Sequence, residues 1–171
     1  MKLEPRIIIL VTVLLVACSR TQAPTATSTP DPQLLSLLQK GRVAHNQGQY
    51  KDALIHLAQA LTISREIDDL NAEATTLSAI ARVYTAQGTY DLALQTYRDA
   101  LAIVRDTDDR VGENTILNDI GSVYRCQSLY EQALKNHMDA LAIAREIGDQ
   151  AGEAAALHNI GLAENALATG D

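Results

Sequence analysis

The chain has 171 residues, enough for one domain of ordinary size, and its 47% apolar and 20% charged residues are the balance of a globular protein. The formal net charge is −7, which argues against nucleic acid as a partner because phosphate binding needs a basic surface. The only aromatic residues are six tyrosines, so Leu, Ile, Val and Ala must fill the core, which suits close packing of helices.

The first 17 residues have the pattern of a secretory signal. Lys2 and Arg6 precede an apolar run over residues 7–17 that only Thr12 interrupts. The run is too short to serve as a stable bilayer anchor, so we interpret residues 1–17 as a signal peptide.

The end of this run, Leu15-Val16-Ala17-Cys18, resembles a bacterial lipobox. The resemblance implies cleavage before Cys18, a diacylglycerol on its thiol and an acyl chain such as palmitate on its new amine. More than one chain is needed for stable anchoring, and such a cysteine meets that condition. An ordinary signal peptide followed by a chance cysteine is the alternative.

Residues 18–32 are rich in Pro and Thr and have no apolar periodicity, which indicates an extended linker. Ser19 follows the cysteine, and in bacteria with two membranes this resembles an outer-membrane address. We therefore expect a lipid-anchored, extracytoplasmic protein of the cell envelope.

A segment of sixteen residues occurs three times, at residues 50–65, 90–105 and 130–145. The copies begin at Tyr50, Tyr90 and Tyr130, which gives a period of forty residues, and seven of the sixteen positions carry the same residue in all three. Self-similarity at a period in this range indicates a solenoid of stacked repeats. A coiled coil is the alternative for successive helices, but its period is seven residues.

About seven helices are predicted from residue 33 onward. Apolar residues at helical spacing, such as Leu77, Ile80, Ala81 and Tyr84, define their buried faces. We call the helices predicted at 33–47, 70–87, 110–127 and 150–168 the A helices, and those at 50–67, 90–107 and 130–147 the B helices. The expected domain is 33–171, with repeats at 33–68, 69–108 and 109–148 and a terminal helix at 149–168.

The predicted turns contain the residues that end and begin helices. Gly48, Gly88 and, less favourably, Ser128 follow A helices, where a left-handed residue is expected. Asp69, Asp109 and Asp149 precede A helices and are expected to cap their free N–H groups. Capping also explains the paired carboxylates Asp68-Asp69 and Asp108-Asp109 better than acid–base catalysis does.

The pattern Leu77, Ile80, Ala81, Tyr84, Gly88, Tyr90, Ala93, Tyr97, Ala100 and its third copy resemble the tetratricopeptide repeat, in its forty-residue form. The resemblance covers residues 33–171 and implies an all-α fold, a right-handed α-solenoid of antiparallel helix pairs. In that family the A helices line a concave groove that holds a peptide or a partner's helix.

The groove positions of the family carry over to polar residues of this chain. The candidate partner-binding residues are Arg42, His45, Ser78, Arg82, Asn118, Ser122, Arg125, His158 and Asn159. The arginines are suited to a carboxylate. Asn159 matches an asparagine that some relatives use to hold a peptide backbone, whereas Asp119 and Ala79 occupy the equivalent places. For any one of these residues, a solvated surface role is the alternative.

No catalytic, cofactor or metal motif is present in the sequence. The four histidines lack metal-ligand spacing, and there is no Cys-x-x-Cys, phosphate loop or nucleophile motif. Cys126 is expected to be a small, half-buried residue; a thiol that links two chains is the alternative. We therefore expect no enzymatic activity, no cofactor and no metal.

Two functions remain open. The first is a non-enzymatic protein–protein interaction scaffold tethered to a bacterial membrane, and the second is the recognition or regulatory arm of a larger signalling or catalytic protein or complex. The last predicted helix has only Glu153 and Glu164 as charges over residues 150–169. Because terminal repeats normally turn a polar face outward, this helix is expected to meet a second copy, another partner or further sequence of a longer chain.

Overall fold

The computed structural model describes residues 31–169; the predicted signal peptide and Cys18 lie outside this range. Those residues form seven helices and no strand: α1 (Pro32–Asn46), α2 (Tyr50–Glu66), α3 (Leu70–Ala86), α4 (Tyr90–Asp106), α5 (Arg110–Cys126), α6 (Tyr130–Ile147) and α7 (Gln150–Thr169). Their bounds agree with the predicted ranges to within one residue, and the all-α class is confirmed. The A helices are α1, α3, α5 and α7.

Aspartates cap three of the A helices. The carboxylate of Asp31 accepts from the backbone N–H of Gln33 at 2.7 Å, and Asp69 and Asp109 accept at 2.9 Å from the N–H three residues further on. The expected cap at Asp149 does not form in this way. Its carboxylate accepts instead from Nδ2 of Asn114, at 3.3 Å.

The chain turns through left-handed residues at the predicted positions. Gly48 and Gly88 have φ of 72° and 74°, and Ser128 adopts the same conformation with φ of 58°. Asp68 and Asp108 are also left-handed, both with φ of 54°. Such a φ is strained for any residue with a Cβ, so the turns at Ser128, Asp68 and Asp108 cost stability that a glycine would avoid.

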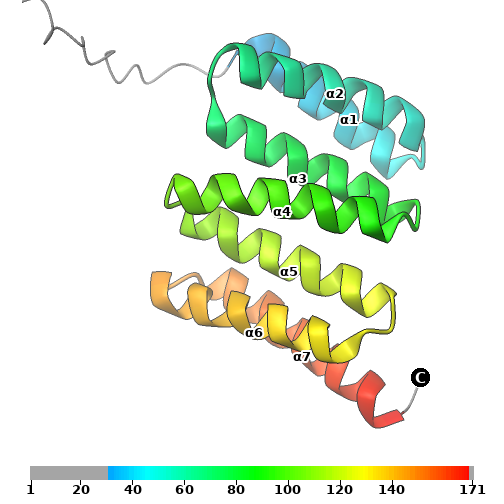
Figure 1. Cartoon of the computed structure of the whole chain (residues 1–171), viewed down its shortest axis with the longest axis vertical. Coiled ribbons are helices and arrows are strands. Elements are labelled where there is room, and N and C mark those ends of the chain that lie inside the picture. Colours follow the sequence, from blue (N-terminus) through cyan, green and yellow to red (C-terminus); the bar gives the residue numbers. More distant parts are fainter. Residues whose placement is uncertain (1–30, 170–171) are drawn as a thin grey trace, which may run out of the picture.

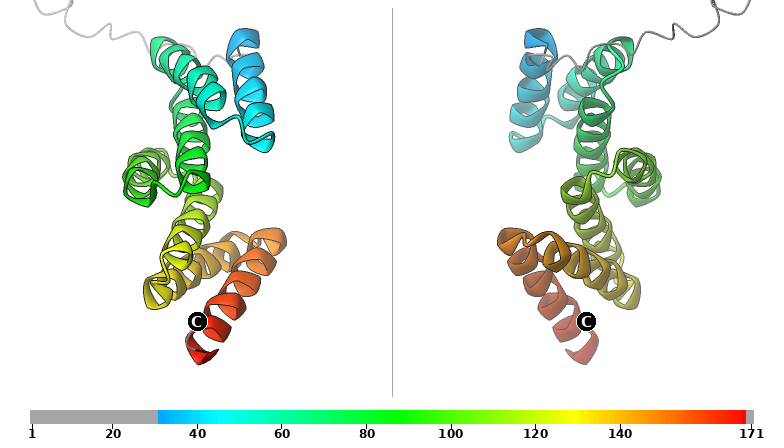
Figure 2. Two further views of the ribbon diagram at one scale, coloured as in Figure 1. Left: turned by 90° about the vertical axis from the view of Figure 1, so that its right-hand side faces the viewer. Right: turned by 90° about the vertical axis from the view of Figure 1, so that its left-hand side faces the viewer.

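The helices stack in sequence order as antiparallel pairs, from α1 at one end to α7 at the other (Figure 1). The first three A helices each pack on the B helix that follows and also contact the next A helix, whereas the B helices do not contact one another within residues 31–169. The side views show the pairs rotating along the stack (Figure 2). The A helices therefore form a continuous inner face.

Small residues at repeat positions allow this close packing. Ala53, Ala93 and Ala133 are completely buried, and the equivalent residues later in each B helix, Ala60, Ala100 and Ala140, are as well. One buried position on the B helices holds a larger side chain, and its residue differs between the copies. It is occupied by Leu57, Tyr97 and His137, each at most 1% exposed. The third repeat thus has an imidazole in its core.

A repeated ion pair joins each B helix to the A helix of the next repeat. Nε of Arg65 lies 2.7 Å from Oε1 of Glu73, and Arg105–Glu113 and Arg145–Glu153 repeat the contact at 2.7 and 2.8 Å. These glutamates also lie in the first turns of their helices, near the positive ends of the helix dipoles. The second pair is extended, because Arg110 contacts Glu113 and also Glu146 at 2.6 Å.

Helix α7 has an open face where the other A helices receive a B helix. Leu157 is 46% exposed, whereas the equivalent Leu77 and Leu117 are 6% and 5% exposed. Gly161 has no atom within 4 Å of the place where a Cβ would be, although Gly121 at the equivalent position packs on His137. No side chain of residues 31–169 therefore packs on Gly161.

Candidate binding groove

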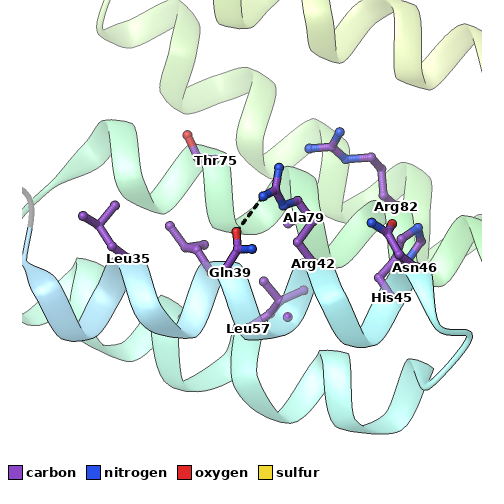
Figure 3. Close-up of a pocket in the computed structure, with 11 residues that line it drawn as sticks. Leu35, Gln39, Arg42, His45, Asn46, Leu57, Thr75, Ala79 and Arg82 are labelled. Atoms are coloured by element: carbon purple, nitrogen blue, oxygen red, sulfur yellow. Dashed lines mark hydrogen bonds between the residues drawn. The ribbon is translucent and has the colours of Figure 1, made fainter.

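The first hollow of the inner face lies between α1 and α3 and has a volume of about 500 Å³. Leu35, Leu38 and Leu57 provide apolar surface, and Arg42, His45 and Arg82 provide polar groups at its edge. In the close-up, the guanidinium groups of Arg42 and Arg82 extend toward the same side of the hollow, although they come from different helices (Figure 3). We call this site the α1/α3 hollow.

The two arginines of the α1/α3 hollow are poorly neutralised. Arg42 donates to Oε1 of Gln39 at 2.6 Å, and no carboxylate oxygen of residues 31–169 lies within 4.0 Å of its guanidinium. Arg82 has only a long contact, 4.0 Å from its Nε to Oδ2 of Asp119, and its side chain is 54% exposed. Both guanidinium groups are therefore available to an anionic group from outside.

The carboxylate of Asp119 is held in place by Tyr97. The buried hydroxyl of Tyr97 donates to its Oδ2 at 3.3 Å. Burial raises the pKa of the Asp119 carboxyl, while the Arg82 guanidinium and the Tyr97 hydroxyl lower it in part. Burial and the neighbouring carboxylate in turn raise the pKa of Tyr97 above its ordinary value. Asp119 is thus a fixed internal partner that limits the side-chain freedom of Arg82.

A second hollow, of about 330 Å³, lies between α5 and α7. We call it the α5/α7 hollow. Asn118, Ser122 and Asn159, three of the predicted groove residues, line it. Nδ2 of Asn159 donates to Oδ1 of Asn118 at 3.1 Å, so one of its two amide N–H donors is used inside the protein.

The same oxygen of Asn118 also contacts the buried histidine. Nδ1 of His137 lies 2.6 Å from Oδ1 of Asn118. Burial, with a smaller contribution from Arg125, lowers the pKa of His137 to about 4. The ring is therefore neutral at pH 7, and its Nδ1–H donates to the amide oxygen. Two donors on one oxygen fix the orientation of Asn118 in the wall of the hollow.

The remaining predicted residues lie outside both hollows. Ser78 is 6% exposed and its hydroxyl donates to the carbonyl of Ala74 at 2.9 Å, so the hydroxyl is used within its own helix. Arg125 is half-buried, and its Nε has no hydrogen-bond partner among the described residues. His158 is exposed on α7.

Sequence reasoning missed two residues of the α5/α7 hollow. Asn114 and Asp149 both line it, and Asn114 is only 3% exposed. One signal was present in the repeat itself: Asn114 stands where Ala74 and Ala154 stand in the neighbouring copies. A polar residue at a position that is apolar in other repeats is worth testing as a site.

Cys126 differs from its expected half-buried state because it is exposed at the end of α5. Within residues 31–169, no group of three or more His, Cys, Asp and Glu side chains is arranged to hold a metal ion. No helix in the same range is long and apolar enough to cross a bilayer.

A family model described as tetratricopeptide repeat matches residues 33–106 and 112–169, which is more than half of the chain. The chain belongs to the tetratricopeptide repeat family. Repeats of this family generally mediate protein–protein interactions and typically form non-enzymatic scaffolds. No curated protein matches the chain.

Solved structures share the tetratricopeptide fold at low sequence identity. A putative kinesin light chain with nearly identical repeats, from Podosopora anserina, matches with a TM-score of 0.68 at 18% identity, over 81% of this chain and 69% of that one. BtubC from P. vanneervenii matches with a TM-score of 0.69 at 22% identity, over 81% and 58%.

A third match is part of a much larger protein. A signal-transduction ATPase with numerous domains and a tetratricopeptide repeat sensor, from Pyrococcus horikoshii, has a TM-score of 0.68 at 17% identity. The match covers 81% of this chain but 22% of the ATPase. At these identities the likeness shows the fold alone.

Proposed function

We propose that this protein is a membrane-tethered interaction scaffold that holds a carboxylate-bearing segment of a partner in the α1/α3 hollow. The single observation that supports binding is the state of Arg42 and Arg82. They lie at the edge of one hollow, and neither has a carboxylate closer than 4.0 Å among residues 31–169. Arg65, Arg105 and Arg145, by contrast, are each paired at 2.7 or 2.8 Å.

The chemistry of the α1/α3 hollow defines the group that it would accept. Two guanidinium groups on adjacent helices suit a carboxylate, because each can donate two parallel hydrogen bonds to it. Leu35, which is 50% exposed, and Leu38 provide apolar surface beside them. The partner segment would therefore combine an acidic group with an apolar side chain.

The test is a pull-down from membranes with Arg42→Gln/Arg82→Gln in the full chain. We expect the double variant to lose a partner that the wild type retains, with an unchanged melting temperature. Arg65→Gln/Arg145→Gln is the matched control, since it removes the same amount of positive charge from two residues that lie outside the hollow. Equal capture by all three proteins would contradict binding in the α1/α3 hollow.

Tethering is a separate part of the proposal and rests on the sequence around Cys18. We expect the mature protein to incorporate a labelled fatty acid and to partition into detergent, and Cys18→Ser to do neither. An unmodified thiol at residue 18 of the mature chain would end this part of the proposal without affecting the binding site.

A second function, the recognition arm of a larger signalling or catalytic protein or complex, is favoured by one comparison. The sensor of the ATPase from Pyrococcus horikoshii has the same fold, and this chain corresponds to 22% of that protein. Continuation of the reading frame beyond Asp171, or copurification with an ATPase subunit at fixed stoichiometry, would support it over the free scaffold.

A further inference from the structure

The two hollows of the inner face have opposite electrical character. Arg42, His45 and Arg82 line the α1/α3 hollow, and no Asp or Glu of residues 31–169 is in its lining. The α5/α7 hollow has Asp119 and Asp149 in its lining and no Lys, Arg or His. Asp119 lies 4.0 Å from Arg82, whereas Asp149 accepts from Asn114 and has no Lys, Arg or His nitrogen within 4.0 Å among residues 31–169, so Asp149 supplies the negative charge that lacks a cationic neighbour.

Asn114 provides an acceptor that nothing in the described structure uses. Its Nδ2 donates to Oδ2 of Asp149 at 3.3 Å, while its Oδ1 is buried and has no hydrogen-bond partner. An unpaired, buried amide oxygen is unfavourable. Alanine fits the position, since Ala74 occupies it in α3 with 4% exposure. A ligand that donates a hydrogen bond would account for the asparagine.

We infer that the α5/α7 hollow binds the ammonium or guanidinium group of a basic side chain on the same partner. This inference rests on the proposed function and adds a second contact to it. The basic group would donate to Oδ1 of Asn114 and be neutralised by Asp149. The groove would then distinguish partners by the order of an acidic and a basic residue.

The spacing of the helices sets the spacing of these two residues. Adjacent packed helices lie about 10 Å apart, so hollows separated by two intervals between A helices are on the order of 20 Å apart. An extended chain rises about 3.3 Å per residue. The acidic and basic side chains of the partner would therefore be roughly six residues apart.

Synthetic peptides test the inference on the full chain purified in detergent. The probes are fluorescein-labelled peptides of about twelve residues, built on one apolar sequence, with an acidic residue alone, a lysine alone, or both about six residues apart. Binding is measured by fluorescence anisotropy. We expect the acidic-and-basic peptide to bind about tenfold more tightly than the acidic peptide.

Asn114→Ala distinguishes the hollow from general attraction to an acidic protein, because it leaves the net charge unchanged. We expect it to abolish the gain from lysine, to leave affinity for the acidic peptide unchanged and to keep or raise the melting temperature. Asn71→Ala, an exposed asparagine on α3, is the control and should retain the gain. Asp149→Asn should reduce the gain, whereas Asp109→Asn, a cap of equal charge, should not.

Two results overturn the inference: equal affinity of the wild type for both peptides, or a gain from lysine that survives in Asn114→Ala. In both cases the proposed function stands if the acidic peptide still binds and Arg42→Gln/Arg82→Gln weakens it. Failure of every acidic peptide to bind the wild type would remove the proposed function as well.

Discussion

The imidazole of His137 packs directly on Gly121: a Cβ at residue 121 would lie 2.6 Å from Cε1 of the ring. The ring is fully buried and is held at Nδ1 by Asn118, so it has little room to move. The third repeat therefore depends on a glycine in the middle of α5.

Gly121→Ala should destabilise the protein by about 1–3 kcal/mol, because the methyl group forces the helices apart. Gly161→Ala is the matched control on α7, where the described part of the chain places no packing neighbour within 4 Å of the added carbon. It should stabilise by about 0.5–1 kcal/mol through helix propensity. Urea unfolding followed by circular dichroism measures both, and equal effects would contradict the packing described here.

His137 should make the protein sensitive to acid. Its pKa is lowered to about 4 in the folded state, below the ordinary 6.5, so the unfolded chain binds the proton first as pH falls. The contribution of His137 to the free energy of unfolding is complete above pH 6.5. As the pH falls toward 4, the free energy of unfolding decreases by about 3 kcal/mol at most.

His137→Leu isolates this effect, since Leu57 fills the same position against Gly41 in the first repeat. Between pH 7 and 4, the free energy of unfolding should fall less in the variant than in the wild type. Other titrating groups, including Asp119, are present in both proteins, so their contributions to the pH dependence cancel in the comparison. Parallel pH profiles for the two proteins would show that His137 does not titrate as described.

Ser128→Gly should stabilise the protein. Ser128 has φ of 58°, the conformation that Gly48 and Gly88 adopt after the other A helices. Removing the Cβ relieves about 0.5–1 kcal/mol of strain net of the entropy that glycine costs. Thermal unfolding should show a higher midpoint for Ser128→Gly, and a lower midpoint for Gly88→Ser.

The repeated glutamates should differ in importance according to their burial. The side chain of Glu113 is 8% exposed and contacts both Arg105 and Arg110, whereas that of Glu153 is 36% exposed and contacts Arg145 alone. Glu113→Ala should cost about 2 kcal/mol and Glu153→Ala about 0.5 kcal/mol. Chemical denaturation checks the order, and a larger loss for Glu153→Ala would refute it.

Helix α7 is predicted to self-associate through its open face. Leu157 is exposed there although its equivalents are buried, so a second copy could cover it. We expect the mass measured by light scattering to rise with concentration, and Leu157→Lys to abolish the rise. Ile55→Lys, at an equally exposed residue of α2, should leave it unchanged. A monomer at all concentrations would count against self-association.

The sequence by itself determined the helices and their order. The forty-residue period, the glycines after A helices and the aspartates before them are local signals, because a turn or a cap involves residues close in the chain. Even here Asp149 was an exception, since a residue thirty-five positions away, Asn114, donates to its carboxylate.

The tertiary structure decided which polar side chains share a hollow. Arg42 and Arg82 are forty residues apart in sequence and line the same hollow only because α1 contacts α3. The hydroxyl of Ser78, by contrast, donates to a carbonyl of its own helix. The repeat pattern also could not show that Asn114 leaves an oxygen unpaired. Burial and pairing of a polar atom depend on every helix around it, which helical periodicity along one segment does not contain.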